Sequence, residues 1–293
     1  MRGRAFAKVN LSLRVQASRP DGLHPIRSLA QSVDWADELS LELAEDEDEF
    51  ILRGADLAAD RDNLAWRAVA AMRADSEPVI HLELQKSIAV AAGLGGGSAD
   101  AAIGLALGAE MFGRSPDIAA AAAADLGADV PFCLAGGTAI LEGIGDEVTR
   151  LAFVDDFAIA IVVPPFELAT PSVYRRWDEL GGPLGPGVEA HHLPGSLRDH
   201  APIGNDLQPA AVDLVPQLGD WISDTTAAWG QPVAMSGSGP SLFGLFGTIG
   251  EASDAIAAVH GARSSVAVLP TSVGWERESG GELPPAPWEE GGR

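Results

Sequence analysis

The chain is poor in residue types that would point to particular classes of protein. It contains a single cysteine, Cys133, so no disulfide can form within the chain, and this usage is typical of a reducing compartment. It has no run of about 18 apolar residues, roughly the minimum for a membrane-spanning helix. Its first residues also lack the apolar segment of a signal peptide. We therefore expect a cytoplasmic protein with no membrane as a partner.

Basic residues are also scarce. Lysine and arginine together number 19 against 42 aspartate and glutamate residues, which gives a formal net charge of −23. Nucleic-acid binding depends on basic side chains that neutralise phosphates, so the composition argues against nucleic acid as a partner. A small phosphorylated ligand remains compatible, because a few local donors can hold it. Only two basic residues are lysines, Lys8 and Lys86, so each is a candidate for a specific role.

The order of predicted elements favours the α+β class. At 293 residues the chain fits two packed domains or one large domain. Periodicity and capping signals predict strands at 6–15, 32–43, 79–84, three within 137–163, and 232–236, 241–246 and 264–269, and helices at 64–72, 98–112, 115–125, 206–229 and 250–260. The segments 45–49 and 127–131 are predicted to be turns, and 181–193 a surface loop. Strands and helices do not alternate regularly, which argues against a doubly wound sheet.

A glycine-rich segment precedes the predicted helix 98–112. Residues 93–98 read Gly-Leu-Gly-Gly-Gly-Ser, and so little side-chain bulk lets backbone N–H groups turn inward. The helix N-terminus behind them adds a partial positive charge, so the segment is suited to hold a phosphate. It is not a Walker loop, which needs a lysine after its last glycine, and Ser98 and Asp100 break the dinucleotide-binding spacing. A flexible turn before a helix is the alternative interpretation.

Three further segments carry polar residues that could act together. Lys8 and Asn10 are two residues apart on one predicted strand, so their side chains share a face. Asp129 lies in a tight turn before Pro131, and Ser-Gly-Ser-Gly at 236–239 joins two predicted strands. Each has a structural alternative when taken alone: a solvated strand charge, an Asx-turn and a hairpin turn, respectively.

Taken together, these segments resemble the three signature motifs of the GHMP kinase superfamily. The resemblance rests on residues 7–11, 92–102 and 236–239, which occur in that order with suitable spacing. It implies a two-part α+β fold, with an N-terminal mixed-sheet domain at 1–160, a C-terminal ferredoxin-like domain at 161–275, and the site in the cleft between them. The tail 276–293 is rich in glycine and proline, and we expect it to be disordered.

Additional segments resemble one branch of the superfamily, whose members phosphorylate a cytidylated methylerythritol in non-mevalonate isoprenoid biosynthesis. These segments are 19–24, 62–64, 126–132, 142–146 and 204–207. The resemblance implies transfer of a phosphoryl group from ATP to the 2-hydroxyl of that small-molecule substrate, with Mg²⁺ as cofactor. A homodimer is compatible with the sequence. A sister kinase acting on homoserine or mevalonate, and a non-catalytic nucleotide-binding protein, are the alternative functions.

The resemblance also implies roles for particular residues. Asp129 would face the acceptor hydroxyl, with Lys8 beside it. The residues implied to bind ATP are Asn63, Lys86, Ala92, Gly93, Leu94, Gly95, Gly96, Gly97, Ser98 (which would lie near Mg²⁺ or a phosphate oxygen) and Asp100. Those implied to bind the substrate are Asn10, His24, Tyr174, Ser236, Gly237, Ser238 and Gly239, with His24 at the cytosine edge and Tyr174 stacked on the base. A solvated strand end for Lys86 and core packing for Tyr174 are the structural alternatives.

Three positions depart from the pattern of that branch. Leu23 replaces a common tyrosine, Ala89 a common proline and Ala99 a serine. Because base stacking on an aromatic ring contributes about 1–3 kcal/mol, we expect Leu23 to weaken cytosine binding by up to roughly tenfold. Neither alanine removes a group that phosphoryl transfer requires.

Overall fold

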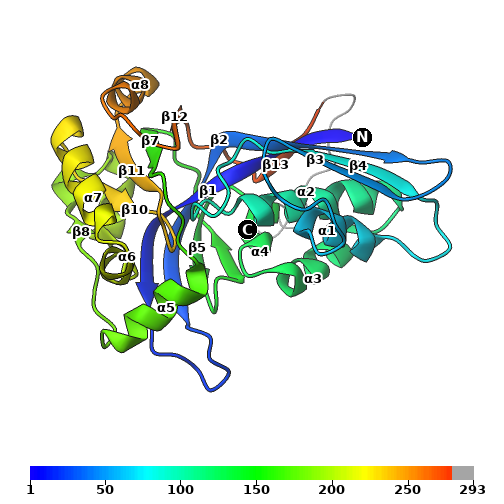
Figure 1. Ribbon diagram of the computed structural model, residues 1–293, viewed down its shortest axis with the longest axis horizontal. Helices are drawn as coiled ribbons and strands as arrows, with labels where there is room; N and C mark the ends of the chain where they lie inside the picture. The colour runs from blue at the N-terminus through cyan, green and yellow to red at the C-terminus, as the bar shows by residue number, and fades with distance from the viewer. Residues whose placement is uncertain (279–293) are drawn as a thin grey trace.

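The structure is a computed structural model that describes residues 1–278. Figure 1 shows an elongated molecule with a sheet toward each end. The two longest strands, β1 (Arg2–Val15) and β2 (Ile26–Leu43), run antiparallel from one half into the other. Strand β1 is buried along most of its length, because Ala5 packs among the helices of one half whereas Val9 and Leu11 pack with strands of the other. The polar Lys8 and Asn10 lie between these apolar residues and are themselves buried.

The larger sheet has seven strands in the order β13-β1-β2-β4-β3, with β5 and β6 continuing from β2. Its further strands are β3 (Glu49–Arg53), β4 (Ile80–Gln85), β5 (Thr138–Glu142), β6 (Glu147–Arg150) and β13 (Trp275–Arg277). Strands β3 and β4 are parallel and the other pairs are antiparallel, so the sheet is mixed.

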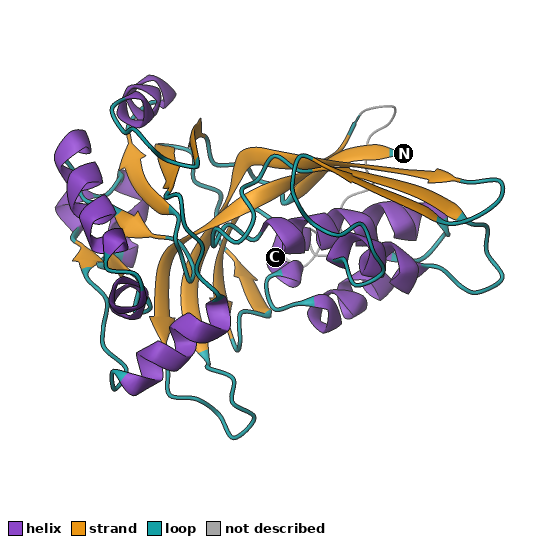
Figure 2. Ribbon diagram, viewed as in Figure 1, coloured by secondary structure: helices purple, strands orange, loops and turns teal. Residues whose placement is uncertain are grey.

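Four helices cover one face of this sheet (Figure 2). They are α1 (Leu64–Met72), α2 (Gly96–Met111), α3 (Pro116–Leu126) and α4 (Val130–Ala135). Helix α1 begins where predicted, because Asn63 Oδ1 accepts a hydrogen bond of 2.9 Å from the backbone N–H of Ala65. Helix α2 is buried against α1, and its small residues Gly104 and Gly108 permit that close approach.

The smaller sheet is antiparallel, with the order β10-β11-β7-β12. Its strands are β7 (Ala158–Val163), β10 (Ala234–Met235), β11 (Leu242–Phe246) and β12 (Ser264–Val268). Its helices are α5 (Thr170–Glu179), α6 (Gln208–Leu214), α7 (Gln217–Trp229) and α8 (Ile249–Ala257). A two-stranded sheet of β8 (Gly187–Val188) and β9 (Ile203–Gly204), with short 3₁₀ helices at Ala190–His192 and Gly195–His200, lies between α5 and α6 in the chain.

The predicted α+β class is confirmed, and several local predictions need correction; among them, the strands predicted from 6 and 32 begin at Arg2 and Ile26, and the loop predicted at 181–193 contains β8 and a 3₁₀ helix. The acidic segment ends earlier than predicted, because Glu49 already belongs to β3. The turn predicted at 127–131 runs directly into α4, and α5 was not predicted. The single helix predicted at 206–229 is two helices, because Pro216 disfavours the helical conformation at Val215, which has φ −132°.

The domain boundaries predicted at residues 160 and 275 both fall within observed strands. The boundary at residue 160 falls inside β7, and the chain returns to the larger sheet through β13, which pairs with β1. Glu276 and Arg277 therefore lie in a strand and not in a disordered tail, and Arg4 forms a 2.9 Å ion pair with Glu276. The rest of the predicted tail, from Ser279 on, lies outside the described residues. None of the described helices has the length and apolar composition to cross a bilayer.

Candidate active site

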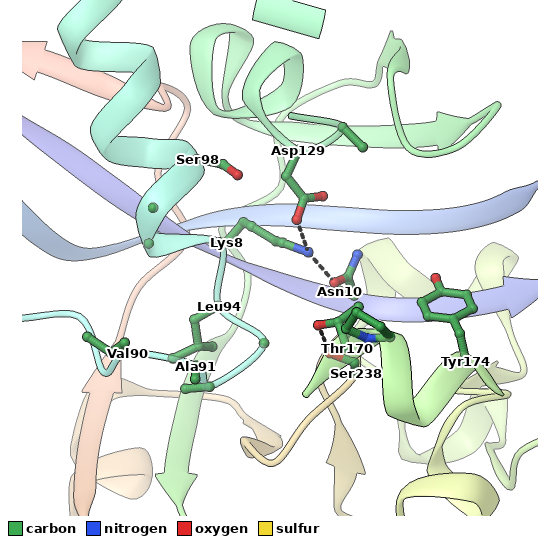
Figure 3. Close-up of a pocket in the computed structure, with 18 of the residues that line it drawn as sticks. Lys8, Asn10, Val90, Ala91, Leu94, Ser98, Asp129, Thr170, Tyr174 and Ser238 are labelled. Atoms are coloured by element: carbon green, nitrogen blue, oxygen red, sulfur yellow. Dashed lines mark hydrogen bonds and ion pairs between the residues drawn. The ribbon is translucent and has the colours of Figure 1, made fainter. Parts of the chain in front are cut away.

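A cavity of about 880 Å³ lies where β1, the glycine-rich segment, the start of α4 and helix α5 meet. Its size is that of a typical small-molecule site. We call the part formed by Gly93–Ser98 the loop end. The part formed by Leu23, His24, Tyr174 and Asp178 is the α5 end. Figure 3 shows Lys8, Asn10 and Asp129 in the space between the two ends.

The loop end is shaped by backbone lying against β1. The N–H of Lys8 donates to the carbonyl of Leu94 at 2.9 Å. Gly95 precedes the first residue of α2 with φ +68°, and a Cβ atom there would lie 2.7 Å from Lys8 Cγ. Only glycine therefore fits at position 95 without displacing Lys8. The first N–H groups of α2 lack partners within the helix, and Gly96, Gly97 and Ser98 line the cavity, so this end can receive an anion.

Lys8 and Asp129 form an ion pair in the middle of the cavity. Lys8 Nζ lies 3.2 Å from Asp129 Oδ2 and also donates to Asn10 Oδ1. The Lys8 side chain is 5% exposed, whereas that of Asp129 is 33% exposed. Asp129 immediately precedes α4, but its side chain does not cap the helix, so the Asx-turn alternative does not apply. Its carboxylate points toward Lys8, and Ser98 lies on the opposite side of the same space, where a reacting group could bind (Figure 3).

The second glycine-containing segment divides into a buried part and a cavity-lining part. Ser236 Oγ accepts from the N–H of Asn10 at 3.1 Å and donates to the carbonyl of Gly93 at 2.9 Å. The buried Ser236 side chain thus links the loop end to β1. Gly237 and Ser238 line the cavity, and Ser238 Oγ lies 2.7 Å from Thr170 Oγ1. Gly239 packs against Met235 and is not among the cavity-lining residues.

Lys86 lines the cavity, but its ammonium group is held inside the protein. Its Nζ donates to Asp37 and lies 2.5 Å from Asp100 Oδ2. Burial alone would lower the pKa of Lys86, but the carboxylates of Asp100 and Asp37 outweigh it and raise that pKa. This geometry excludes the solvated strand end. It also shows that the charge of Lys86 is directed at two carboxylates.

Asp37 is a residue that the sequence interpretation missed. Its Oδ1 accepts hydrogen bonds from the N–H groups of Ser87, at 2.5 Å, and Ile88, at 2.8 Å, so it fixes the chain leading into the loop end. A signal was present: in the alternating strand 32–43, Asp37 falls on the apolar face with Leu39 and Leu41. A carboxylate on a buried face requires a partner.

Asp100 is the third member of the buried cluster formed with Asp37 and Lys86, and its pKa is raised. Burial raises the pKa of Asp100 to about 8; the positive charge of Lys86 opposes the change and the negative charge of Asp37 adds to it. Two carboxylates share a single ammonium group, so one of them favours the protonated form. Asp100 Oδ1 is buried without a hydrogen-bond partner in the described structure.

The α5 end brings together His24 and Tyr174, the two residues that the family resemblance implies for base binding. Their ring centroids are 5.1 Å apart with an interplanar angle of 32°. Burial, with a smaller contribution from the charge of Asp129, raises the pKa of Tyr174 to about 12, so its hydroxyl stays protonated at neutral pH. Leu23 lines the rim and is 47% exposed. The cavity-lining residues missed at this end are Thr170, Arg175 and Asp178.

The remaining predicted residues are placed as follows. Asn63, Ala92, Gly93, Leu94 and Asp100 line the cavity, as does Ala89, whereas Ala99 is buried within α2. Within residues 1–278, no group of three or more His, Cys, Asp and Glu side chains could hold a metal ion. The Ser98 hydroxyl and the Asp129 carboxylate are oxygen donors on opposite sides of one space (Figure 3). Mg²⁺ bound mainly through nucleotide phosphates needs only one or two such protein oxygens, so these residues fit that ion.

Comparisons with known proteins show which family this chain resembles. The family described as GHMP kinases N terminal domain matches residues 63–137. A 4-diphosphocytidyl-2-C-methyl-D-erythritol kinase of Rhizobium etli is 38% identical over 275 residues, covering 88% of this chain and 90% of that protein. The crystal structure of a 4-(cytidine 5'-diphospho)-2C-methyl-D-erythritol kinase superposes with a TM-score of 0.77 and 32% identity, covering 92% of this chain and 99% of the other.

A more distant structural neighbour shows how far the fold extends. Homoserine kinase from Cytophaga hutchinsonii superposes with a TM-score of 0.69 at 21% identity, covering 94% of this chain and 96% of that one, and this level of likeness shows the shared fold alone. The identity that extends over most of the chain is to the branch predicted from the sequence. This chain is a small-molecule kinase of the GHMP superfamily and belongs to the 4-diphosphocytidyl-2-C-methyl-D-erythritol kinase family.

Proposed function

We propose that the chain transfers the γ-phosphoryl group of ATP to the 2-hydroxyl of 4-diphosphocytidyl-2-C-methyl-D-erythritol. The observation that carries the proposal is the Lys8–Asp129 pair at 3.2 Å, which faces the start of α2 and Ser98 across one cavity. Family membership supports the choice of substrate. The intact ion pair argues against a protein that only binds nucleotide, because such a protein has no need of a carboxylate held beside a lysine.

In the proposed reaction the ATP phosphates lie at the loop end. Backbone N–H groups of Gly95–Ser98 and the positive end of α2 hold them, and Asn63 and Asp100 line the same cavity. Mg²⁺ bound to the phosphates would neutralise part of their charge, and the Ser98 hydroxyl and the Asp129 carboxylate are the protein oxygens that would hold it. In phosphoryl transfer the protein mainly positions the reacting groups and stabilises charge, and the backbone N–H groups of the loop end can do both.

Asp129 then acts on the acceptor. Its carboxylate accepts the proton of the 2-hydroxyl as the new P–O bond forms, while the bond between the γ-phosphorus and the bridging oxygen breaks and ADP leaves. Lys8 orients Asp129 and places a positive charge beside the transferred group. Asn10 Oδ1 accepts a hydrogen bond from Lys8 Nζ and so orients it. Asn10 is itself fixed by Ser28, because its Nδ2 donates to Ser28 Oγ at 2.7 Å. Tyr174 stacks on the cytosine, with Leu23 on the open side.

The proposal extends to the location, partners and oligomeric state of the enzyme. A cytoplasmic location and small-molecule partners, without nucleic acid or membrane, are supported by the single cysteine and the net charge of −23. A monomer and a homodimer are both compatible with a cavity formed within one chain, and analytical ultracentrifugation distinguishes them.

The test is an ATP-consumption assay with Mg²⁺ on three acceptors: the cytidylated methylerythritol, homoserine and mevalonate. We expect turnover on the first alone, with a new phosphate on the 2-hydroxyl in the ³¹P NMR spectrum of the product. Turnover on another acceptor would assign the chain a different substrate. Binding of ATP with no turnover on any of the three would support the nucleotide-binding alternative.

A further inference from the structure

The chain that runs into the loop end, Val90–Leu94, has most of its carbonyl groups engaged by the protein. Arg263 Nη2 donates to the carbonyl of Val90 at 2.8 Å, and the N–H of Ser241 donates to that of Ala92 at 3.2 Å. The last two carbonyls of the segment accept the hydrogen bonds already described at the loop end. Within residues 1–278, the N–H groups of this segment pair with no acceptor, and all five residues line the cavity. The segment can therefore offer backbone donors to a ligand.

Ala91, in the middle of this segment, has a left-handed backbone. Its φ is +51°, and within residues 1–278 no other residue with a Cβ atom has a positive φ. This conformation is unfavourable for a residue with a Cβ atom, so it persists only where the surrounding contacts enforce it. The residues on either side of Ala91 are the two whose carbonyls Arg263 and Ser241 hold. These two hydrogen bonds are therefore in place to maintain the conformation of Ala91.

Arg263 is anchored at the edge of the smaller sheet. Its backbone N–H donates to the carbonyl of Val163 in β7 at 2.8 Å, and β12 begins at the next residue. Its guanidinium group forms an ion pair of 3.0 Å with Glu167 through Nη1, which leaves Nη2 directed at Val90. Arg263 is not among the cavity-lining residues, and its side chain is 31% exposed. Its contact with the site is therefore made through the carbonyl of Val90.

Val90 and Ala91 belong to the nucleotide side of the cavity. Figure 3 shows them on the opposite side of Lys8 from Tyr174, and they directly precede the loop end in the chain. Lys8 and Asp129, by contrast, are carried by β1 and by the start of α4. A shift of Val90 and Ala91 would therefore change the nucleotide site and leave the catalytic pair in place.

We propose that Arg263 is a positioning residue for ATP: by holding the carbonyl of Val90 it keeps Ala91 left-handed, so that the backbone N–H groups of this segment remain directed at the nucleotide. The inference rests on the proposed function, because it assumes that a nucleotide lies along this segment. Arg263 is separated from Val90 by 173 positions in the chain and belongs to none of the sequence motifs.

The test measures binding of a non-hydrolysable ATP analogue with Mg²⁺ by calorimetry, beside steady-state kinetics. Arg263→Met keeps an unbranched side chain and removes the donors, so Kd and KM for the nucleotide should rise about fivefold, as for loss of one partly exposed charged hydrogen bond. At saturating ATP, kcat and KM for the acceptor should stay within about twofold, because the contact is lost equally in ground and transition states.

A second background tests whether the effect passes through the backbone. Glycine adopts a positive φ without the penalty that a Cβ atom brings, so Ala91→Gly should make the nucleotide site less dependent on Arg263. In that background, Arg263→Met should change Kd by no more than about twofold. An equal rise of Kd in both backgrounds would show that Arg263 acts through its charge at a distance, and that result overturns the inference.

The matched control is Arg150→Met, the same change at another arginine that holds a backbone carbonyl. Arg150 Nη2 donates to the carbonyl of Ser272 at 3.2 Å, and neither residue lines the cavity, so Kd for the analogue should not change. If Arg263 had a purely structural role, Arg263→Met would lower the urea midpoint and leave Kd at the wild-type value, which overturns the inference while the proposed function stands. A rise of Kd that Ala91→Gly suppresses, in a protein that fails to phosphorylate the cytidylated substrate, would refute the proposed function and support the role of Arg263.

Discussion

The loop end of the cavity is shaped by backbone, whereas the α5 end is shaped by side chains. At the loop end, a Cβ atom at Gly95 would strike Lys8, and the chain leading into the loop is fixed by Asp37 and its buried partners. At the α5 end, Leu23 and Asp178 are both nearly half exposed. Changes at the loop end should therefore cost stability and nucleotide binding together, while changes at the α5 end should alter substrate preference and leave the fold intact.

The largest expected effect lies between the two ends, at Asp129. Asp129→Asn should lower kcat by about 10²- to 10⁴-fold, because the amide cannot accept the hydroxyl proton. ATP binding should persist, since the backbone of the loop end is unchanged. Single-turnover kinetics and calorimetric ATP binding measure the two effects separately. Equal loss of kcat and ATP binding would show that Asp129 has a structural role. It would also contradict the proposed difference between the loop end and the α5 end.

The next effect concerns the buried cluster behind the loop end. Asp37→Ala removes one carboxylate beside Lys86 and leaves the N–H groups of Ser87 and Ile88 unpaired, so unfolding free energy should fall by about 3–5 kcal/mol. KM for ATP should rise in parallel. Urea denaturation provides the measurement. Asp178→Asn is the control at the α5 end and should cost less than about 1 kcal/mol, because the Asp178 side chain is 46% exposed. Similar costs at both sites would contradict the comparison.

A smaller, pH-dependent effect is expected from Asp100. Its pKa is raised from 3.8 to about 8 in the folded protein, so between these values the folded state retains a proton that the unfolded state has released. The stability that this group contributes is complete below its unfolded pKa and is lost as pH rises toward 8, by at most about 1.4 kcal/mol per pH unit. Wild type should therefore lose stability relative to Asp100→Asn between about pH 5 and about pH 8. Parallel unfolding curves over that range would show that Asp100 does not titrate there.

The smallest effect is expected at the rim of the α5 end. Leu23→Tyr offers a second aromatic face to the base and should lower KM for the cytidylated substrate by up to about tenfold. KM for ATP should stay unchanged. Leu184→Tyr is a suitable control, because Leu184 is 78% exposed and does not line the cavity. A change in the ATP parameter would show that the two ends are coupled.

Local patterns in the sequence predicted much of the loop end. The cap at Asn63, the start of α2 and the shared face of Lys8 and Asn10 follow from neighbouring residues, and each is present. The division of 206–229 at Pro216 was also predictable, since proline disfavours a helical conformation in the residue before it. By contrast, α5 was not predicted, and Asp178 was not selected, because its neighbours lie on other segments of the chain. Asp37 had a sequence signal, its place on an apolar strand face, but its partners Lys86, Ser87 and Ile88 are distant in the chain.

The sequence by itself determined the α+β class and the family, and it predicted a phosphate site at residues 93–98, because these depend on residue type and order along the chain. Only the tertiary structure decided that Lys86 is shared by Asp37 and Asp100, that Asp129 lies against Lys8, and that Asp178 lies 3.2 Å from His24 Nε2. Each of these pairs joins separate elements. Their charges meet because the strands and helices pack in one arrangement, and burial then sets which group keeps its proton and which remains free for a ligand.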